Sequence, residues 1–298
     1  MLIQRLELRE SLSEQRKLPP PLRAHTTLTI GELEEVKARG LVSILMFNGL
    51  VVILAGAASY FLAGITLRPI QEMLEEQSIF ISNASHELRT PIAVLRAELE
   101  TAQLEKKLTE TQVRELISSN LEEVLQLQEL SDKLLQITQL QDGRRSRHSA
   151  PTALQDILTA AVAKIQPLAR KKKITLTAAT SSTVVSANSH ELTECLIIIL
   201  ENAVKYSPEK SHITLTTHED AKHVTIQVID AGCGIDKKDL PHIFERFYRA
   251  DASRSQTQGY GLGLSIAQKI ITQHSGTLSV TSTLGSGTTV TIKLPVAK

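Results

Sequence analysis

Residues 85–91 form a short polar cluster that ends at a proline: Ser85-His86-Glu87-Leu88-Arg89-Thr90-Pro91. His86 lies two residues from both Ala84 and Leu88, which belong to an apolar series with helical spacing. At 100° per residue, this offset places the imidazole on the side of the helix opposite the apolar residues. Packing gives no reason for a histidine there, so the segment predicts a helix that presents His86 to solvent.

Apolar residues continue with helical spacing on both sides of this cluster. The first series is Ile81, Ala84, Leu88, Leu95, Leu99 and Ala102, and the second is Leu121, Val124, Leu127, Leu130, Leu134, Ile137 and Leu140. Steps of three, four and seven residues predict two amphipathic helices, the second starting at about Thr109, with a connection at 104–108. One copy cannot cover so much apolar surface, so residues 68–142 are expected to pair with a second copy as a four-helix bundle.

Upstream of the hairpin, residues 41–67 carry no charge and consist mainly of Leu, Ile, Val, Ala and Gly. This length exceeds the roughly 20 apolar residues that cross a bilayer. The alternative is a buried helix of a soluble protein, but such helices rarely lack a charge for so many turns. A transmembrane helix is therefore expected over 41–67. Residues 1–40 are polar and lack a signal-peptide core, so we interpret them as an extracytoplasmic tail whose first membrane helix lies further upstream.

The composition disfavours two classes of function. The formal net charge is +1, and no basic run is interleaved with aromatic residues, so nucleic acid is not expected as a partner. The two cysteines, Cys195 and Cys233, lack the spacing of metal ligands. They are interpreted as reduced thiols, and no zinc site is predicted.

The C-terminal half mixes both kinds of secondary structure. Residues 143–150 are polar and basic and are interpreted as a linker. Helices are predicted over 153–169, 191–206 and 262–274, and strands over 174–177, 183–186, 213–217, 223–229, 277–282 and 288–294. Strands packed under helices on one face would give an α+β sandwich over 151–298.

This half contains two glycine clusters. The first follows a predicted strand, and the second opens a predicted helix. Residues 230–235 read Asp-Ala-Gly-Cys-Gly-Ile, and residues 259–265 read Gly-Tyr-Gly-Leu-Gly-Leu-Ser. Glycines at a helix N-terminus expose N–H groups that bind phosphate. A dinucleotide-binding fold would need a strand directly before the second cluster. A polar stretch stands there instead, so that interpretation is rejected.

The cluster at residues 85–91 resembles the phospho-acceptor motif of bacterial two-component sensor histidine kinases, and the resemblance extends from Arg68 to the C-terminus. It implies that His86 attacks the γ-phosphate of ATP and that Glu87 acts as an acid/base that orients the imidazole. It also implies that Thr90 positions water when phosphate is removed from the partner. An imidazole suits this chemistry because it keeps a free lone pair near pH 7.

The same resemblance implies an ATP-binding domain of the Bergerat type over 151–298. Asn202 would hold Mg²⁺, Lys205 would approach phosphate and Tyr206 would flank the adenine. Mg²⁺ prefers oxygen ligands such as an amide carbonyl and phosphates. Ile198 stands where many relatives carry a second asparagine.

Further nucleotide contacts are implied by the motifs that follow. Asp230 would accept a hydrogen bond from the exocyclic amine of adenine, and Gly232 and Gly234 would let the backbone approach the ring. Residues 243–249 resemble the phenylalanine-containing segment of a mobile lid. The expected phosphate-binding residues are Arg249, Arg254, Gly259, Gly261, Leu262 and Gly263.

The resemblance implies a membrane-bound homodimer that phosphorylates an aspartate of a response regulator and also dephosphorylates it. A gyrase- or chaperone-type ATPase is an alternative, but it lacks the helix that carries His86. A membrane adaptor without catalysis is a third possibility. Lys37 and Arg39 before the span would place the N-terminal side in the cytoplasm. We give more weight to the opposite orientation, because ATP is cytoplasmic.

Overall fold

The computed structural model describes residues 30–105, 108–141, 150–250 and 259–297. The chain divides into two compact units, residues 1–76 and residues 77–298. Helix α2 (Ile30–Leu104) is continuous through both prolines in it, Pro69 and Pro91. In the first unit all side chains over 41–67 are exposed, and α2 is the one helix among the described residues that is apolar and long enough to cross a membrane.

Helix α3 (Glu110–Gln141) runs antiparallel to the C-terminal part of α2, as the sequence predicted. It begins with a capping box, in which the Gln112 N–H donates to Thr109 Oγ1 and the Gln112 side chain accepts from the Thr109 N–H. Two bonds to Glu98 of α2 fix the register of the hairpin. The Ser119 hydroxyl donates to Oε1 at 2.9 Å, and the Asn120 amide donates to Oε2 at 3.1 Å.

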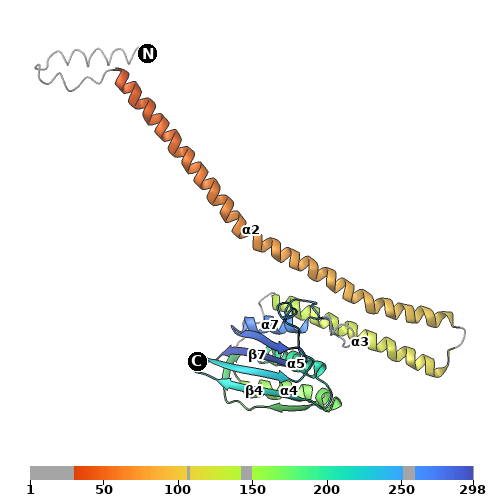
Figure 1. Ribbon diagram of the computed structural model, residues 1–298. Coiled ribbons are helices and arrows are strands. Elements are labelled where there is room, and N and C mark those ends of the chain that lie inside the picture. The colour runs from red at the N-terminus through yellow and green to blue at the C-terminus, as the bar shows by residue number, and fades with distance from the viewer. Residues whose placement is uncertain (1–29, 106–107, 142–149, 251–258, 298) are drawn as a thin grey trace, which may run out of the picture. The chain divides into compact units, whose positions relative to one another are not determined.

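The C-terminal part is an α+β sandwich, which confirms the predicted class. Its five-stranded sheet has the order β2 (Thr175–Ala178), β4 (His212–Glu219), β5 (His223–Asp230), β7 (Gly287–Pro295) and β6 (Thr277–Thr283). Only the β2–β4 pair is parallel. Three helices, α4 (Leu154–Lys171), α5 (Ser189–Tyr206) and α7 (Gly263–Gln273), pack with this sheet (Figure 1).

Alternation along β5 explains why the helices cover one face of the sheet. Val224, Ile226 and Val228 are buried, while the residues between them are half-buried or exposed. Successive side chains in a strand point to opposite faces, so the buried set faces the helices and the polar set faces solvent.

A second, two-stranded sheet was not predicted. Strand β1 (Ala150–Ala153) pairs antiparallel with β3 (Val184–Ala187), with Ala150 opposite Ala187. Ala150 therefore belongs to a strand rather than to the expected linker, whose other residues, 143–149, lie outside the described ranges. Four residues are too few to show an alternating pattern, and their pairing partner is distant in sequence.

The packing of the second apolar series corrects part of the dimer expectation. Leu130, Ile137 and Leu140 are buried within one chain, in a cluster that continues into the core of the sandwich. The hydrophobic periodicity of a helix identifies its apolar faces but does not say which neighbour covers each one. These three residues face the sandwich, whereas others on the same helix, such as Ile117 and Leu121, are exposed.

Candidate functional site

His86 is exposed on α2, between buried Ala84 and half-buried Leu88, as its helical offset predicts. The Thr90 hydroxyl donates to the carbonyl oxygen of His86 at 3.3 Å. His86 and Thr90 are one turn apart and therefore share a helix face. Glu87 is also exposed. This part of the hairpin thus presents an imidazole, a hydroxyl and a carboxylate to its surroundings.

The last two turns of α5 carry Asn202, Lys205 and Tyr206, all half-buried. Lys172 stabilises this helix end, because its ammonium donates to the carbonyl oxygens of Val204, Lys205 and Ser207 at 3.1, 2.8 and 3.2 Å. Carbonyls in the last turn of a helix lack intrahelical donors, so a cation there satisfies them. The Lys205 ammonium also lies 5.3 Å from the centroid of the Tyr206 ring.

Asp230 is held at the end of β5 by two backbone N–H groups. Its Oδ1 accepts from Gly232 N at 2.8 Å and from Thr288 N at 3.1 Å. Burial raises the pKa of Asp230, although both of these bonds act to lower it. Because both bonds use the same oxygen, the geometry keeps Oδ2 for a further donor, such as an exocyclic amine.

Gly232 and Gly234 allow the chain to pass very close to its neighbours. A Cβ at Gly232 would lie 2.8 Å from the carbonyl oxygen of Tyr206. Gly234 has a φ of +69°, and a Cβ there would lie 2.0 Å from the carbonyl oxygen of Thr283. The loop after Asp230 is therefore packed directly against the end of α5 and against the β6–β7 turn.

The second glycine cluster also reaches α5. Gly263 opens α7, with the position of its absent Cβ 3.8 Å from the amide nitrogen of Asn202. Beside Gly259 lies the ammonium of Lys205, 2.5 Å from where a Cβ would be. Leu262 is buried and anchors the start of α7. The structure thus brings residues 202–206, 230–234 and 259–263 close together. Arg254 lies outside the described residues.

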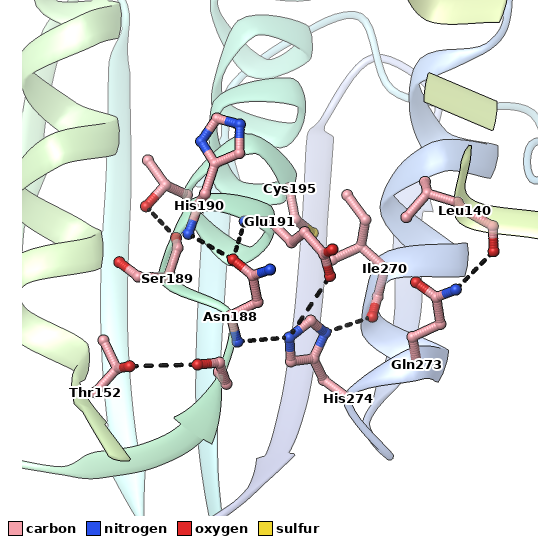
Figure 2. Close-up of polar contacts among 12 residues, drawn as sticks. Leu140, Thr152, Asn188, Ser189, His190, Glu191, Cys195, Ile270, Gln273 and His274 are labelled. Carbon is pink, nitrogen blue, oxygen red and sulfur yellow. Dashed lines mark hydrogen bonds and ion pairs between the residues drawn. The ribbon is translucent and has the colours of Figure 1, made fainter. Parts of the chain in front are cut away.

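A buried histidine links α5 to α7 at the opposite end of the two helices. The Asn188 side chain caps α5 by accepting from the N–H groups of His190 and Glu191 (Figure 2). The Asn188 N–H donates to Nε2 of His274 at 3.0 Å, and Nδ1–H of His274 donates to the Ile270 carbonyl at 2.8 Å. This bridge fixes the helices that carry the nucleotide motifs.

The donor set fits a magnesium nucleotide. Asp230 can accept from an amine, while Lys205 and the N-terminus of α7 can bind phosphate. Among the described residues, no group of three or more His, Cys, Asp or Glu side chains is arranged to hold a metal ion. The amide oxygen of Asn202 and the phosphate oxygens of a nucleotide are ligands that a magnesium ion accepts.

The glycine cluster touches the hairpin directly. The Tyr260 hydroxyl donates to the carbonyl oxygen of Gln126 on α3 at 3.0 Å. Burial raises the pKa of Tyr260, and the carboxylates of Glu129, Glu87 and Glu123 raise it further.

Three more contacts join the sandwich to the hairpin. The Phe80 ring of α2 packs against Phe247 with centroids 5.8 Å apart, and the Arg246 guanidinium lies 5.3 Å from the centroid of Phe80. The Gln273 amide donates to the Leu140 carbonyl at 2.6 Å, as Figure 2 shows. The sequence analysis did not identify Phe80 as a contact residue. Its position just before the phospho-acceptor segment was the one signal that could have pointed to it.

Two family models match this chain. Residues 76–143 match the His Kinase A (phospho-acceptor) domain, and residues 187–298 match the histidine kinase-, DNA gyrase B-, and HSP90-like ATPase. The fold and the site therefore define a protein that joins a phospho-acceptor hairpin to a nucleotide-binding domain of the ATPase type.

Two curated relatives identify the family within this class of protein. The signal transduction histidine-protein kinase ArlS of Staphylococcus epidermidis is 34% identical over 76% of this chain and 50% of ArlS. The sensor histidine kinase RppB of Synechocystis is 34% identical over 82% of this chain and 54% of RppB. The chain belongs to the sensor histidine kinase family, and it spans about half the length of the curated relatives it matches.

Solved structures agree on the fold. The histidine kinase ThkA in complex with the response regulator protein TrrA has a TM-score of 0.60 at 19% identity, covering 80% of this chain and 66% of that one. The Acinetobacter baumannii histidine kinase AdeS has a TM-score of 0.58 at 22% identity, covering 72% of this chain and 98% of AdeS. Because the sandwich matches the ATPase family model, we call it the ATPase domain.

Proposed function

We propose that this chain is an ATP-dependent histidine kinase that phosphorylates its own His86 and passes the phosphoryl group to an aspartate of a response regulator. A nitrogen of the His86 ring would attack the γ-phosphorus as its bond to the bridging oxygen breaks, and ADP would leave with that electron pair. Glu87 would accept a hydrogen bond from the other ring nitrogen and fix the tautomer.

One observation carries this proposal: the glycine cluster that opens α7 contacts the hairpin at the level of the phospho-acceptor segment. Tyr260 bonds to the Gln126 carbonyl of α3, and Phe247 packs against Phe80 of α2, which lies just before the phospho-acceptor segment. A kinase that modifies its own side chain must bring its nucleotide site to that side chain. A gyrase- or chaperone-type ATPase has no reason to carry an exposed histidine beside such a contact.

Each nucleotide motif receives a role within this proposal. Asp230 reads the adenine amine, with Gly232 and Gly234 providing close approach to the ring. Asn202 supplies an oxygen to Mg²⁺, which when bound neutralises charge on the phosphates. The proposed phosphate and base contacts are Lys205, Tyr206, Arg249, Arg254, Gly259, Gly261, Leu262 and Gly263.

The chain would act as a homodimer through its hairpin. Exposed apolar residues recur on α3 at helical spacing, including Val113, Ile117, Leu121 and Val124. Ile92 and Leu99 of α2 are likewise exposed. An apolar face of this length is normally covered in solution, and a second copy of the hairpin would complete a four-helix bundle.

The segment 41–67 would cross the cytoplasmic membrane, with the ATPase domain on the cytoplasmic side. None of its side chains is buried, which disfavours a core helix of a soluble protein. We retain the division into a tail at 1–40, a span at 41–67, a hairpin at 68–142 and an ATPase domain at 151–298. Thr90, which shares a face with His86, suits the positioning of water during dephosphorylation of the regulator.

The test is incubation of the full chain with ATP labelled in the γ-phosphate. We expect acid-labile, alkali-stable label on the wild-type chain and none on His86→Gln, with the affinity for ATP unchanged. His190→Gln is the matched control, because His190 is also exposed on a helix of the same chain. Undiminished label on His86→Gln, or no label on a wild-type chain that binds ATP, would overturn the proposal.

A further inference from the structure

The hairpin contributes a cation to the neighbourhood of the nucleotide site. Lys133 of α3 forms an ion pair with Glu129, one turn earlier on the same helix. The pKa of Lys205 is lowered by burial, then by the charge of Arg249 and then by that of Lys133. Glu129 and Glu201 act in the opposite direction. Gly259, which lies beside the Lys205 ammonium, directly precedes Tyr260, whose hydroxyl bonds to the Gln126 carbonyl two turns before Lys133 on α3.

Lys133 is unlike the other cations that form ion pairs along the two long helices. Its side chain is 25% exposed, whereas Arg114, which forms an equivalent pair with Glu110 on α3, is 78% exposed. An exposed i,i+4 pair on a helix is worth only a few tenths of a kcal/mol and has no further role. The partial burial of Lys133 instead follows from its position on the face of α3 that packs against the ATPase domain, beside buried Leu130 and Ile137.

The register of the hairpin places Lys133 at the height of His86. Glu98 of α2 bonds to Ser119 and Asn120 of α3. Because the helices are antiparallel with the same rise per residue, the twelve residues from Glu98 back to His86 correspond to twelve residues forward on α3. That step arrives at Ser131 and Asp132, next to Lys133. The same short stretch of hairpin therefore carries both the acceptor and this cation.

We propose that Lys133 is a phosphate-positioning residue of the hairpin, which joins Lys205 in contacting the terminal phosphate of ATP as that group moves to His86. This inference rests on the proposed function. Two ammonium groups near one another favour an anion between them, and the departing phosphoryl group carries that charge. Glu129 pairs with Lys133 and keeps its ammonium in this region. The ATPase domain alone would bind ATP normally, and the second cation would act only when the hairpin is in place.

The test measures ATP affinity and the single-turnover rate of His86 labelling separately, on the full chain. Lys133→Gln should slow labelling by roughly 10- to 100-fold, the range for loss of one charge-assisted hydrogen bond, and leave ATP affinity unchanged. Lys133→Arg should restore most of the rate because it keeps the charge. Return of the phosphoryl group from His86 to ADP should slow by the same factor as the forward reaction. Arg114→Gln, which breaks the matched exposed ion pair, should change neither the rate of His86 labelling nor the rate of return to ADP.

Three results would overturn the inference. The first is a rate for Lys133→Gln equal to that of Arg114→Gln. The second is a loss of ATP affinity that accounts for the slower rate, and the third is a Lys133→Arg variant as slow as Lys133→Gln. A wild-type chain that binds ATP but leaves His86 unlabelled would instead refute the proposed function. Labelled wild type with an unaffected Lys133→Gln would refute only the role of Lys133.

Discussion

The hairpin and the ATPase domain hold their candidate residues in different ways. In the ATPase domain, the candidate residues are fixed by the backbone: Asp230 by two N–H groups, and the end of α5 by the Lys172 ammonium. In the hairpin, His86 and Glu87 project from an exposed helix face, and much of the apolar surface of α3 is uncovered.

This difference separates binding from transfer. A nucleotide site that one domain assembles alone can bind ATP whatever the hairpin does. The acceptor depends on where the hairpin lies relative to that site, and contacts such as Tyr260 to Gln126 decide this position. Substitutions should therefore fall into two groups, those that change ATP affinity and those that change only the transfer rate.

The largest effect is expected from a charge on the uncovered face of the hairpin. Leu121→Asp places a carboxylate on this face, twice in a symmetric dimer, and each buried unpaired charge costs several kcal/mol. We expect the rate of dimer dissociation to increase by roughly 1,000-fold, as measured by subunit exchange between fluorescently labelled full chains.

Glu122→Gln is the matched control, because it changes a charge on the neighbouring exposed residue. ATP affinity should be the same in both variants, since the ATPase domain has its own core. Subunit exchange at the wild-type rate in Leu121→Asp would show that this face is not the dimer interface.

A smaller effect, on ATP binding rather than on phosphoryl transfer, is expected from Asp230→Asn. The asparagine oxygen can still accept from Gly232 and Thr288, but the charge that would attract the adenine amine is lost. ATP affinity should fall by roughly 10-fold, measured by equilibrium binding, and His86 should still be labelled when ATP is saturating. An unchanged affinity would remove Asp230 from the adenine site.

Asp230→Asn should also change how the free energy of unfolding depends on pH. The folded-state pKa of Asp230 is raised, so the protonated carboxyl favours the folded state below the ordinary aspartate pKa of about 3.9. This contribution is lost as the pH rises through the raised pKa. Asp230→Asn should therefore gain stability relative to wild type over that rise, as measured by denaturant unfolding. A pH-independent difference between the two proteins would contradict it.

The smallest effect is expected from Tyr260→Phe, which removes one neutral hydrogen bond between the domains. Such a bond contributes about 0.5–1.5 kcal/mol, so the rate of His86 labelling should fall by roughly 2- to 10-fold with ATP affinity unchanged. Tyr60→Phe, at an exposed tyrosine outside the ATPase domain, should leave the rate unaltered. If Tyr260→Phe instead weakened ATP binding, Tyr260 would belong to the nucleotide site rather than to the contact between domains.

Local features of the chain were predictable from the sequence because short-range physics determines them. The periodicity of apolar residues located both helices of the hairpin, and the capping box at Thr109 begins α3 where the pattern starts. Gly232 and Gly234 were expected to let the backbone approach the adenine ring, and in the structure they let it pass close to Tyr206 and Thr283. The convergence of 202–206, 230–234 and 259–263 followed from the family resemblance.

Long-range contacts were not predictable in this way. Lys133 and Glu129 have the spacing of an ordinary solvated pair on a helix, and only the docking of the ATPase domain distinguishes them from Arg114 and Glu110. Leu130 and Ile137 fit a dimer seam by their spacing, yet they are buried within one chain. Strand β1 was missed because its partner lies more than thirty residues away.

The most direct measurement locates the phosphoryl group after a single turnover of the full chain with γ-labelled ATP, by mapping the labelled peptide under alkaline conditions that preserve phosphohistidine. Transfer from the ATPase domain to the hairpin predicts that the label lies on the imidazole of His86. Label confined to serine, threonine or tyrosine, or spread over other histidines such as His190, would contradict it.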